Sequence, residues 1–276
     1  MVVRISGTSH AILEGVELRG PLNVEGSVGR ISIVMPAYNV EDDIVEAISE
    51  VRGVLEKITD DYEIIVVNDG STDDTARRVE GVMDGHVKIV NHSVNMGKGA
   101  AVKTGVRYAS GDYTILLDAD RDIDVRNMMQ YIKALREYDV VIGSKRHPKS
   151  IYQAPTLRKI LSVGYNILVK ALLGIRVGDT QTGFKAFKTK YLKMIMNVIV
   201  VRRYSWDAEA LAIANMLKLK IAEAPVHIRQ EKLFKLKDVL NMLIELLGIV
   251  YRLRVIKWYQ KSIEKLNMQY EPPMKI

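Results

Sequence analysis

Two aspartates one residue apart, Asp118 and Asp120, follow the apolar run Tyr113 to Leu117. Such a run is typical of a buried strand, and open α/β sheets bind their ligands at the carboxyl ends of the strands. Two carboxylates held this close repel each other unless a cation lies between them. A hard divalent ion such as Mg²⁺ or Mn²⁺, held by a few carboxylates and by substrate phosphates, fits the pair. Asp122 follows and adds to the negative charge.

The same acidic residues also have a plainer interpretation. They can form a solvated loop in which Asp124 caps a predicted helix from Val125 to Arg136. An Asp-x-Asp pair by itself does not distinguish the two interpretations. Its position directly after a predicted strand favours a functional site.

Composition excludes several kinds of chemistry. The 276-residue chain has no cysteine, so it has no disulfide, no thiolate metal site and no cysteine nucleophile. A metal must therefore use oxygen or imidazole ligands, and the five histidines show no close metal-ligand spacing. The net charge of +7 favours an anionic partner: nucleic acid, a membrane surface or a phosphorylated substrate. We expect no nucleic acid, because the chain lacks zinc-finger spacing and RNA-binding aromatic motifs.

The elements that must position the aspartates alternate regularly from Ile31 onward. Short apolar runs predict strands, and helical patterns of ten or more residues separate most of them. This alternation predicts an α/β fold with a Rossmann-like, mostly parallel sheet flanked by helices. Polar loops after three of the strands, at 36–39, 68–71 and 118–122, should then share one edge of the sheet. The predicted strands are Ile31 to Met35, Glu63 to Val67, Val87 to Val90, Tyr113 to Leu117 and Val140 to Gly143.

The second half alternates less clearly and is expected to be more helical. Helices are predicted from Thr156 to Leu173 and from Trp206 to Leu217, and one long helix or two from Asp238 to Lys265. We divide the chain into an N-terminal extension (1–29), a catalytic domain (30–237) and a C-terminal amphipathic helical segment (238–276).

No membrane-spanning helix or signal peptide is expected. No stretch reaches the roughly 18 apolar residues that a span requires, and the first 30 residues lack a sustained apolar core. Val239 to Tyr251 comes nearest, but Asn241 and Glu245 interrupt it. That pattern fits an interfacial helix and also an ordinary core helix.

Familiar nucleotide and hydrolase motifs are absent from the sequence. Gly97-Lys98-Gly99 begins like a dinucleotide fingerprint, but Val102 stands where the third glycine belongs. No phosphate-binding loop ending in Gly-Lys-Ser/Thr occurs, and no Gly-x-Ser-x-Gly elbow. These absences weaken the dehydrogenase, ATPase and α/β-hydrolase interpretations.

Four motifs in order resemble those of the family 2 glycosyltransferases, over roughly residues 30–240. The resemblance implies a GT-A fold and transfer of a sugar from a nucleotide diphosphate donor. The motifs are Ile33-Val34-Met35-Pro36-Ala37-Tyr38-Asn39, Val66-Val67-Asn68-Asp69-Gly70-Ser71-Thr72-Asp73, Asn95-Met96-Gly97-Lys98-Gly99-Ala100-Ala101 and Asp118-Ala119-Asp120.

Later motifs resemble the polyprenyl-phosphate hexosyltransferase branch, which includes dolichyl-phosphate mannose synthase and dolichyl-phosphate glucosyltransferase. They are Gly143-Ser144-Lys145-Arg146, Arg158 with Ser162, Asp179-Thr180-Gln181-Thr182-Gly183-Phe184-Lys185 and Ser205-Trp206-Asp207-Ala208-Glu209. The sequence around Thr182 resembles the glucosyltransferases more than the mannose synthases.

This chain also departs from the branch at three places. Val40 separates Asn39 from the acids Glu41 and Asp42, and Asp122 stands where related synthases often have Gln. Leu233-Phe234-Lys235 replaces the usual Gly-x-Ser-Lys, which puts an acceptor-phosphate role of Lys235 in question.

The resemblance implies the following donor site. Asp120, helped by Asp122, would hold Mg²⁺ or Mn²⁺, which neutralises the leaving nucleoside diphosphate. Asp118 would lie near the ribose or the metal. Asp69 would accept a hydrogen bond from the base, Lys98 would contact the diphosphate, and Gln181 would help to order a loop around the sugar. The base would be walled by Pro36, Ala37 and Tyr38, and Glu41 would reach ribose or base.

The implied acceptor is dolichyl or polyprenyl phosphate, which is largely ionised at neutral pH and needs no dedicated base. Arg146, Arg158, Arg229 and Lys235 are the candidate phosphate ligands, with a hydrogen bond from Ser162. The reaction would invert the anomeric centre. We expect a cytoplasmic protein, peripheral at the cytoplasmic face of a membrane and held there by Val239 to Tyr259, by an anchoring subunit or only transiently.

Two alternatives remain open at this stage. A glycosyltransferase acting on a soluble or glycan hydroxyl would need a carboxylate base, for which Asp207 or Glu209 is the candidate. A sugar-nucleotide-binding protein without turnover is the other alternative, and the intact pair of Asp118 and Asp120 argues against it.

Overall fold

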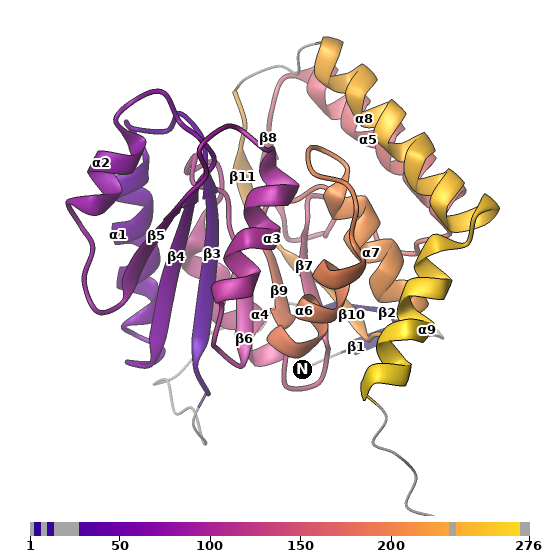
Figure 1. The fold of residues 1–276 in the computed structure, drawn as a ribbon, viewed down its shortest axis with the longest axis horizontal. Helices are drawn as coiled ribbons and strands as arrows, with labels where there is room; N and C mark the ends of the chain where they lie inside the picture. Colours follow the sequence, from indigo (N-terminus) through magenta and orange to yellow (C-terminus); the bar gives the residue numbers. More distant parts are fainter. Residues whose placement is uncertain (1–2, 7–9, 14–27, 232–235, 271–276) are drawn as a thin grey trace, which may run out of the picture.

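The computed structural model describes residues 3–6, 10–13, 28–231 and 236–270 (Figure 1). Their main sheet has nine strands in the order β1-β2-β10-β7-β9-β6-β3-β4-β5, and β8 and β11 form a separate parallel pair. The strands are β1 (Val3–Ser6), β2 (His10–Leu13), β3 (Ile31–Ala37), β4 (Tyr62–Asn68), β5 (Val87–Asn91), β6 (Tyr113–Leu116), β7 (Val140–Ser144), β8 (Ile151–Gln153), β9 (Lys185–Lys188), β10 (Ile221–Pro225) and β11 (His227–Arg229).

The main sheet is mostly parallel and flanked by helices, which confirms the predicted fold class. Only β9, between β6 and β7, and the edge strand β1 run antiparallel to their neighbours. The helices are α1 (Ile44–Leu55), α2 (Thr75–Glu80), α3 (Lys98–Tyr108), α4 (Met128–Ala134), α5 (Thr156–Leu173), α6 (Thr189–Val198), α7 (Trp206–Met216), α8 (Leu236–Val250) and α9 (Trp258–Tyr270), with the short turns η1 (Val125–Asn127) and η2 (Tyr251–Val255).

The connections between strands reverse direction beside β3. From β3 the chain adds β4 and β5 on one side, then returns to place β6 on the other. A crevice at the carboxyl ends of the strands is expected at such a reversal, here between β3 and β6. The pairing of these strands ends at Val34 and Leu116, with one further bond from Leu117 N–H to the Val34 carbonyl.

Pro36 lies where that pairing has ended, which explains how a proline fits inside a central strand. Its nitrogen faces the β6 side of β3, and a proline has no N–H to donate there. The strand therefore continues through Pro36 to Ala37 along β4, two residues beyond the predicted end at Met35.

Alternate residues of each strand enter two cores, one on each face of the sheet. Ile33 and Met35 of β3 belong to the core that includes α1 and α4, whereas Val34 belongs to the core that includes α3, α7 and α8. All seven residues of β4 are buried and five of them are apolar, as expected for a central parallel strand.

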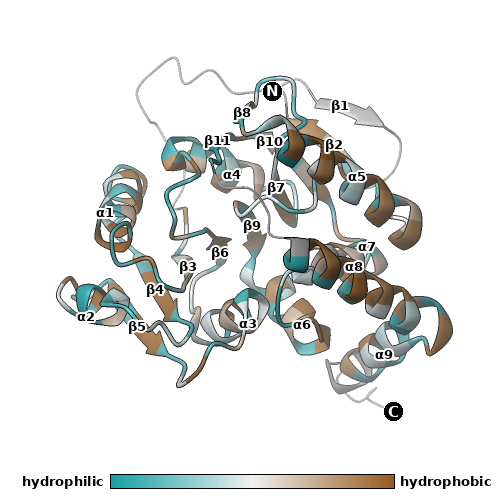
Figure 2. Cartoon of the chain, turned by 90° about the horizontal axis from the view of Figure 1, so that it is seen from above, coloured by the Kyte–Doolittle hydropathy of each residue, from teal (hydrophilic) through white to brown (hydrophobic). Residues whose placement is uncertain are grey.

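Described residues near both ends of the chain pack against the same body. β2 pairs in parallel with β10, so part of the predicted N-terminal extension extends the main sheet. Of the two predicted possibilities for the C-terminal segment, one long helix or two, the structure has two helices, α8 and α9, joined by the π-helical turn η2. α8 runs beside α5 on the outside of the molecule (Figures 1 and 2). Within the described residues, no helix combines the length and apolar character needed to span a membrane.

Candidate active site

The loop after β6 carries the paired aspartates into the crevice between β3 and β6. Asp118 and Asp120 flank the buried Ala119, so neither carboxylate is part of the core. Arg121 then adopts a left-handed backbone conformation (φ 57°), which is uncommon for a residue with a side chain. This turn reverses the chain and brings the Asp122 N–H to 3.2 Å from the Asp120 carboxylate.

A pocket of about 520 Å³ lies between the ends of β3 and β6, and we call it the β3–β6 pocket. It brings together most of the residues predicted to bind the donor, and Tyr38 stands at it with 47% of its surface exposed. The residues that line it are Pro36, Ala37, Tyr38, Val40, Asp69, Asn95, Gly97, Lys98, Asp118, Ala119, Asp120, Arg203 and Tyr204.

Asp118 is held between a cation and a glycine. Its Oδ1 lies 2.6 Å from the Nζ of Lys98, the first residue of α3. Its Oδ2 packs against Gly183, where any side chain would overlap the carboxylate. Although burial lowers the pKa of Lys98, the charges of Asp118 and then Asp207 raise it above the ordinary value. Lys98 therefore stays protonated, and it neutralises Asp118 from within the protein.

Asp120 is less well compensated than Asp118. Partial desolvation in the crevice, and then the like charges of Asp118 and Asp122, raise the pKa of Asp120 to about 6, against the opposing influence of Lys98. Its carboxylate lies at the exposed mouth of the pocket. A cation that binds near such a carboxylate stabilises its ionised form.

Asp69 holds the turn that delivers Lys98. Its carboxylate accepts hydrogen bonds from the backbone N–H groups of Met96 and Gly97, at 2.9 and 2.8 Å. It also lies 2.7 Å from Nδ1 of the buried His92. Glu41 is engaged in a similar way, because it accepts the backbone N–H of Asp74 at 2.7 Å. Both acids thus already have protein partners beside the predicted base site.

A second cavity, of about 680 Å³, adjoins the first, and we call it the arginine cavity. Asp120 lines both cavities, so this residue is shared between them. Arg158 and Arg229, two of the predicted phosphate ligands, lie here together with Asp122. Arg229 also pairs with Glu231 at 2.9 Å. The lining residues are Asn39, Val40, Glu41, Asp42, Asp43, Asp73, Asp120, Arg121, Asp122, Arg158, Arg229 and Glu231.

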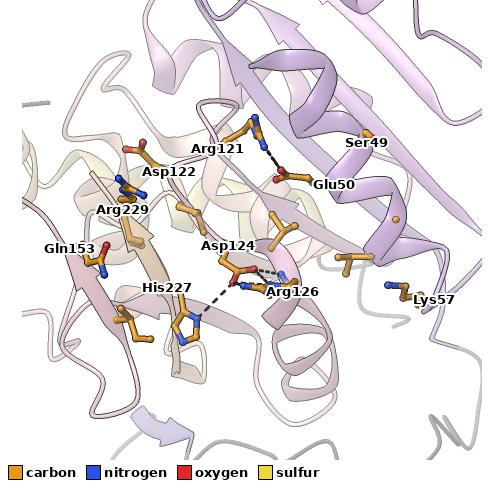
Figure 3. A pocket seen from close by; sticks show the side chains of 16 residues that line it. Ser49, Glu50, Lys57, Arg121, Asp122, Asp124, Arg126, Gln153, His227 and Arg229 are labelled. Atoms are coloured by element: carbon orange, nitrogen blue, oxygen red, sulfur yellow. Dashed lines mark hydrogen bonds and ion pairs between the residues drawn. The ribbon is translucent and has the colours of Figure 1, made fainter. Parts of the chain in front are cut away.

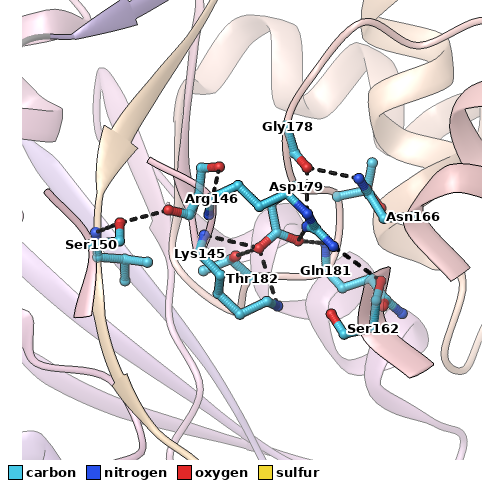
Figure 4. Close-up of polar contacts among 12 residues, drawn as sticks. Lys145, Arg146, Ser150, Ser162, Asn166, Gly178, Asp179, Gln181 and Thr182 are labelled. Carbon is cyan, nitrogen blue, oxygen red and sulfur yellow. Dashed lines mark hydrogen bonds and ion pairs between the residues drawn. The ribbon is translucent and has the colours of Figure 1, made fainter. Parts of the chain in front are cut away.

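Three other predicted site residues, Arg146, Ser162 and Gln181, line neither cavity. They meet around the buried Asp179 (Figure 4). The Arg146 guanidinium donates to the carbonyls of Gly178 and Ser162, at 3.0 and 3.2 Å. The backbone N–H of Gln181 donates to Asp179 at 3.0 Å. These contacts order the loop before β9, and Lys235 lies outside the described residues.

Asp207 and Glu209, the candidate bases for a hydroxyl acceptor, are both buried and both engaged. Asp207 lies 2.5 Å from the buried Lys185. Glu209 accepts the backbone N–H of Val201 at 2.7 Å and the hydroxyl of Tyr259. Neither residue lines the β3–β6 pocket or the arginine cavity.

The loop that carries Asp122 is anchored from behind, where a further cavity of about 610 Å³ separates it from α1 (Figure 3). The Arg121 guanidinium donates to Glu50 of α1 at 2.6 Å. Asp124 accepts the backbone N–H of Arg126 at 2.9 Å, as a helix cap does, and lies 3.8 Å from the ring of His227. These contacts hold the aspartate loop against two separate elements.

The residues present fit a divalent ion that takes only one or two of its ligands from the protein. In the described part of the chain, no three acids or histidines converge closely enough to enclose a metal, so Asp118, Asp120 and Asp122 form no closed cage. Mg²⁺ and Mn²⁺ are commonly held by one or two carboxylates together with substrate phosphates. Asp120, with Asp118 behind it, fits that arrangement.

Two pocket residues, Arg203 and Tyr204, were not predicted from the sequence. They precede the Ser205-Trp206-Asp207 motif, and only the fold brings them to the pocket that Asp118 lines. The one available signal was the pair of charges at Arg202 and Arg203 beside that motif.

Comparison with known proteins gives a consistent result. The family model described as glycosyl transferase family 2 matches residues 32–195. A dolichyl-phosphate beta-glucosyltransferase of Trichomonas vaginalis is 32% identical over 84% of this chain and 74% of its own length. The Homo sapiens protein of the same name is 30% identical, over 86% of this chain and 80% of its own.

Among solved structures, glucosyl-3-phosphoglycerate synthase from Mycobacterium tuberculosis, in complex with Mn²⁺, UDP and glucosyl-3-phosphoglycerate, has a similar fold. The TM-score is 0.61 at 20% identity, covering 81% of this chain and 79% of that one. At this identity the likeness concerns the fold, which is of the GT-A type.

Proposed function

Because this chain belongs to glycosyl transferase family 2, we propose that it transfers a hexose from a nucleotide diphosphate sugar to dolichyl phosphate or another polyprenyl phosphate. The observation that carries the proposal is the position of Asp120, which lines both the β3–β6 pocket and the arginine cavity. A donor in the first and an anionic acceptor in the second would meet at this carboxylate.

The β3–β6 pocket is proposed to bind the donor. The base would lie against Pro36, Ala37 and the exposed ring of Tyr38. Asp120 and Asp118 would hold Mg²⁺ or Mn²⁺, which supplies Lewis-acid stabilisation of the departing diphosphate when bound. Lys98, already charged beside Asp118, would contribute a second positive charge from the protein.

The arginine cavity is proposed to receive the acceptor phosphate. Arg158 and Arg229 can place planar guanidinium groups against a phosphate, although Arg229 must then give up part of its pairing with Glu231. Seven acidic residues also line this cavity, so a phosphate would bind there only with a cation that offsets their charge. A phosphate monoester is largely ionised at neutral pH, so no protein base is needed. Attack from the face opposite the diphosphate would invert the anomeric carbon.

The relatives favour glucose as the sugar. Those named above are dolichyl-phosphate beta-glucosyltransferases, and a structural neighbour has been solved with UDP-glucose. We therefore propose UDP-glucose as donor ahead of GDP-mannose. A hydroxyl acceptor is disfavoured, because both of its candidate bases are buried, are engaged by protein partners and line neither of the two cavities.

A lipid-bound acceptor requires access to a membrane surface, and α5 and α8 offer a suitable face. The two helices lie side by side and are rich in hydrophobic residues (Figure 2), and several of their large apolar side chains are exposed. Exposed lysine and arginine side chains, among them Lys159, Arg254 and Lys257, lie along the same helices and the turn after them. The apolar residues are Leu157, Ile160, Val163, Ile167, Leu168, Leu240, Ile244, Leu247 and Tyr251.

The transfer proposal is tested with purified protein, Mn²⁺, a polyprenyl phosphate and either labelled UDP-glucose or labelled GDP-mannose. We expect lipid-soluble label from UDP-glucose, and no loss of that label when free sugars are added as competing acceptors. If neither donor yields lipid-soluble label, the proposed function is wrong.

The membrane proposal is tested by sedimentation with vesicles containing anionic lipid. The wild-type protein should sediment with them. A double variant that combines Ile244→Glu and Leu247→Glu should bind to a smaller extent. Met83→Glu is the matched control, because Met83 is an exposed apolar residue far from these helices in the sequence. Equal sedimentation of all three proteins would contradict the proposed membrane face.

A further inference from the structure

Part of the wall of the β3–β6 pocket is a turn between α6 and α7. Arg203 and Tyr204 of this turn line the pocket together with Lys98, Asp118 and Asp120. The Arg202 carbonyl accepts the backbone N–H of Ala100 at 3.0 Å, in the first turn of α3. The position of the turn and the position of Lys98 are therefore linked.

The link tolerates little displacement, because the backbone at the start of α3 packs directly against the backbone of the turn. Gly97, with φ 97°, would place any Cβ only 2.6 Å from the Arg202 carbonyl oxygen. Gly99 packs as closely against the Val201 carbonyl. A shift of the turn would thus push directly on the segment that carries Lys98.

α8 holds this turn from outside the pocket. The Glu245 carboxylate accepts the backbone N–H groups of Tyr204 and Ser205, at 3.0 and 2.8 Å, just before α7 begins. These are amides that helix geometry leaves without a partner inside α7. The Tyr204 hydroxyl donates to Asp238 of the same helix at 2.7 Å.

Ser205 adds a third connection between the turn and its surroundings. Its hydroxyl donates to the Met242 carbonyl of α8 at 3.0 Å and accepts from the Tyr165 hydroxyl of α5 at 2.8 Å. α5, α7 and α8 therefore meet at the residue next to the pocket wall.

These contacts account for the polar residue that interrupts the apolar sequence of α8. Ile244 and Leu247 on either side of Glu245 are exposed, at 67% and 62%. Glu245 is only half-buried, yet its carboxylate is turned inward to the amides of Tyr204 and Ser205. A helix needed only for packing or for a membrane surface would have no reason to keep a carboxylate there.

We propose that Glu245 is a positioning residue for the donor site, and that it fixes Arg203 and Tyr204 at the distance from Lys98 that a nucleotide diphosphate sugar requires. The proposal rests on the proposed function only for the identity of the ligand. On this proposal α8 is part of the donor site, because its inner face holds the turn that forms part of the pocket wall. The outer face of α8 is apolar.

The experiment compares Glu245→Ala and Glu245→Gln with the wild type. Glu264→Gln is the matched control, because it removes an exposed carboxylate from the neighbouring helix α9. Binding of UDP and of GDP is measured by calorimetry with Mn²⁺ present. Hydrogen exchange is measured for the amides of Tyr204 and Ser205 and for the Gly97 to Ala100 segment.

We expect Glu245→Ala to weaken nucleotide binding about tenfold, since two charge-assisted hydrogen bonds are lost. Glu245→Gln should lie between Ala and wild type, because its amide oxygen still accepts hydrogen bonds but carries no charge. In transfer assays the donor KM should rise while kcat at saturation stays nearly constant. Exchange should accelerate at Tyr204 and Ser205 and also in the Gly97 to Ala100 segment.

Unchanged nucleotide affinity in both Glu245 variants would overturn the proposal, even if exchange at Tyr204 and Ser205 accelerates. If Glu245→Ala does not fold, Glu245→Gln decides by the same measurements. A wild-type protein that binds neither UDP nor GDP would instead defeat the proposed function. The positioning role would then stand or fall on whether exchange in the Gly97 to Ala100 segment responds to the Glu245 substitutions.

Discussion

Two acidic centres of this molecule, both at the carboxyl-end edge of the sheet, have opposite electrostatics. Asp179 is buried, accepts the backbone N–H groups of Lys145 and Gln181, and lies 3.2 Å from the Lys145 Nζ. Against the cost of burial, Lys145 and these hydrogen bonds hold its pKa at about 2. Asp120 lies in the other centre, where desolvation and neighbouring carboxylates raise its pKa to about 6.

The difference shows which centre the protein completes by itself. Asp179 has its cations and donors within the chain, and its contacts order the loop before β9 (Figure 4). Asp120 has two further acids and one lysine around it, so an external cation would stabilise its ionised carboxylate. A carboxylate whose charge is balanced by cations and donors of the same chain supports the structure. A carboxylate surrounded by other negative charges is suited to bind a metal ion together with a phosphate ligand.

The same substitution in the two centres should have different consequences, and the largest is expected at Asp120. Asp120→Asn should reduce transfer by about 10²-fold or more, because a group that stabilises the leaving diphosphate loses its charge. The free energy of unfolding at neutral pH should not fall and should rise somewhat, because the substitution removes a charge that desolvation and the neighbouring carboxylates disfavour. Transfer assays and denaturant unfolding measure the two quantities, and undiminished turnover would refute the metal site.

Asp179→Asn should reverse that pattern. The substitution leaves Lys145 and Arg146 without their buried counter-charge, which should cost about 3 kcal/mol of unfolding free energy. Denaturant unfolding measures this loss. A variant as stable as the wild type would show that the two centres do not differ as described.

Acid should destabilise the wild type through Asp179. Its folded pKa of about 2 lies below the ordinary 3.8, so the carboxylate contributes stability above pH 3.8 and loses it as pH falls toward 2. The contribution is about 2 kcal/mol. Unfolding free energies of wild type and Asp179→Asn, measured between pH 5 and 2, should converge by about that amount, and parallel curves would contradict it.

The smallest effect is expected at Asp122, which adds to the charge around Asp120. Asp122→Asn should lower the pKa of Asp120 from about 6 and weaken Mn²⁺ binding at neutral pH about threefold, since one nearby negative charge is lost. The midpoint of Mn²⁺ binding against pH should move down. Asp124→Asn is the control, because Asp124 pairs with Arg126, and an equal shift there would rule out a specific role of Asp122.

Local patterns predicted most of the fold. The apolar runs located β3 to β7 within one or two residues, because buried strands require apolar side chains on both faces. The reversed direction of β9 and the attachment of β2 to β10 were not predicted, because strand pairing is set by contacts between distant segments. The same applies to the π-helical turn that divides the C-terminal helices.

By itself, the sequence determined the chemistry available to this protein: oxygen ligands without cysteine, paired aspartates after a strand, and the ordered motifs of a glycosyltransferase. Only the tertiary structure decided which of the charged residues face a cavity. It placed Arg158 and Arg229 near Asp120, directed Arg146 toward the loop around Asp179, and brought Tyr204 to the pocket through Glu245 of α8. The physical reason is that a side chain's type follows from the sequence, whereas its partners depend on segments that folding brings together.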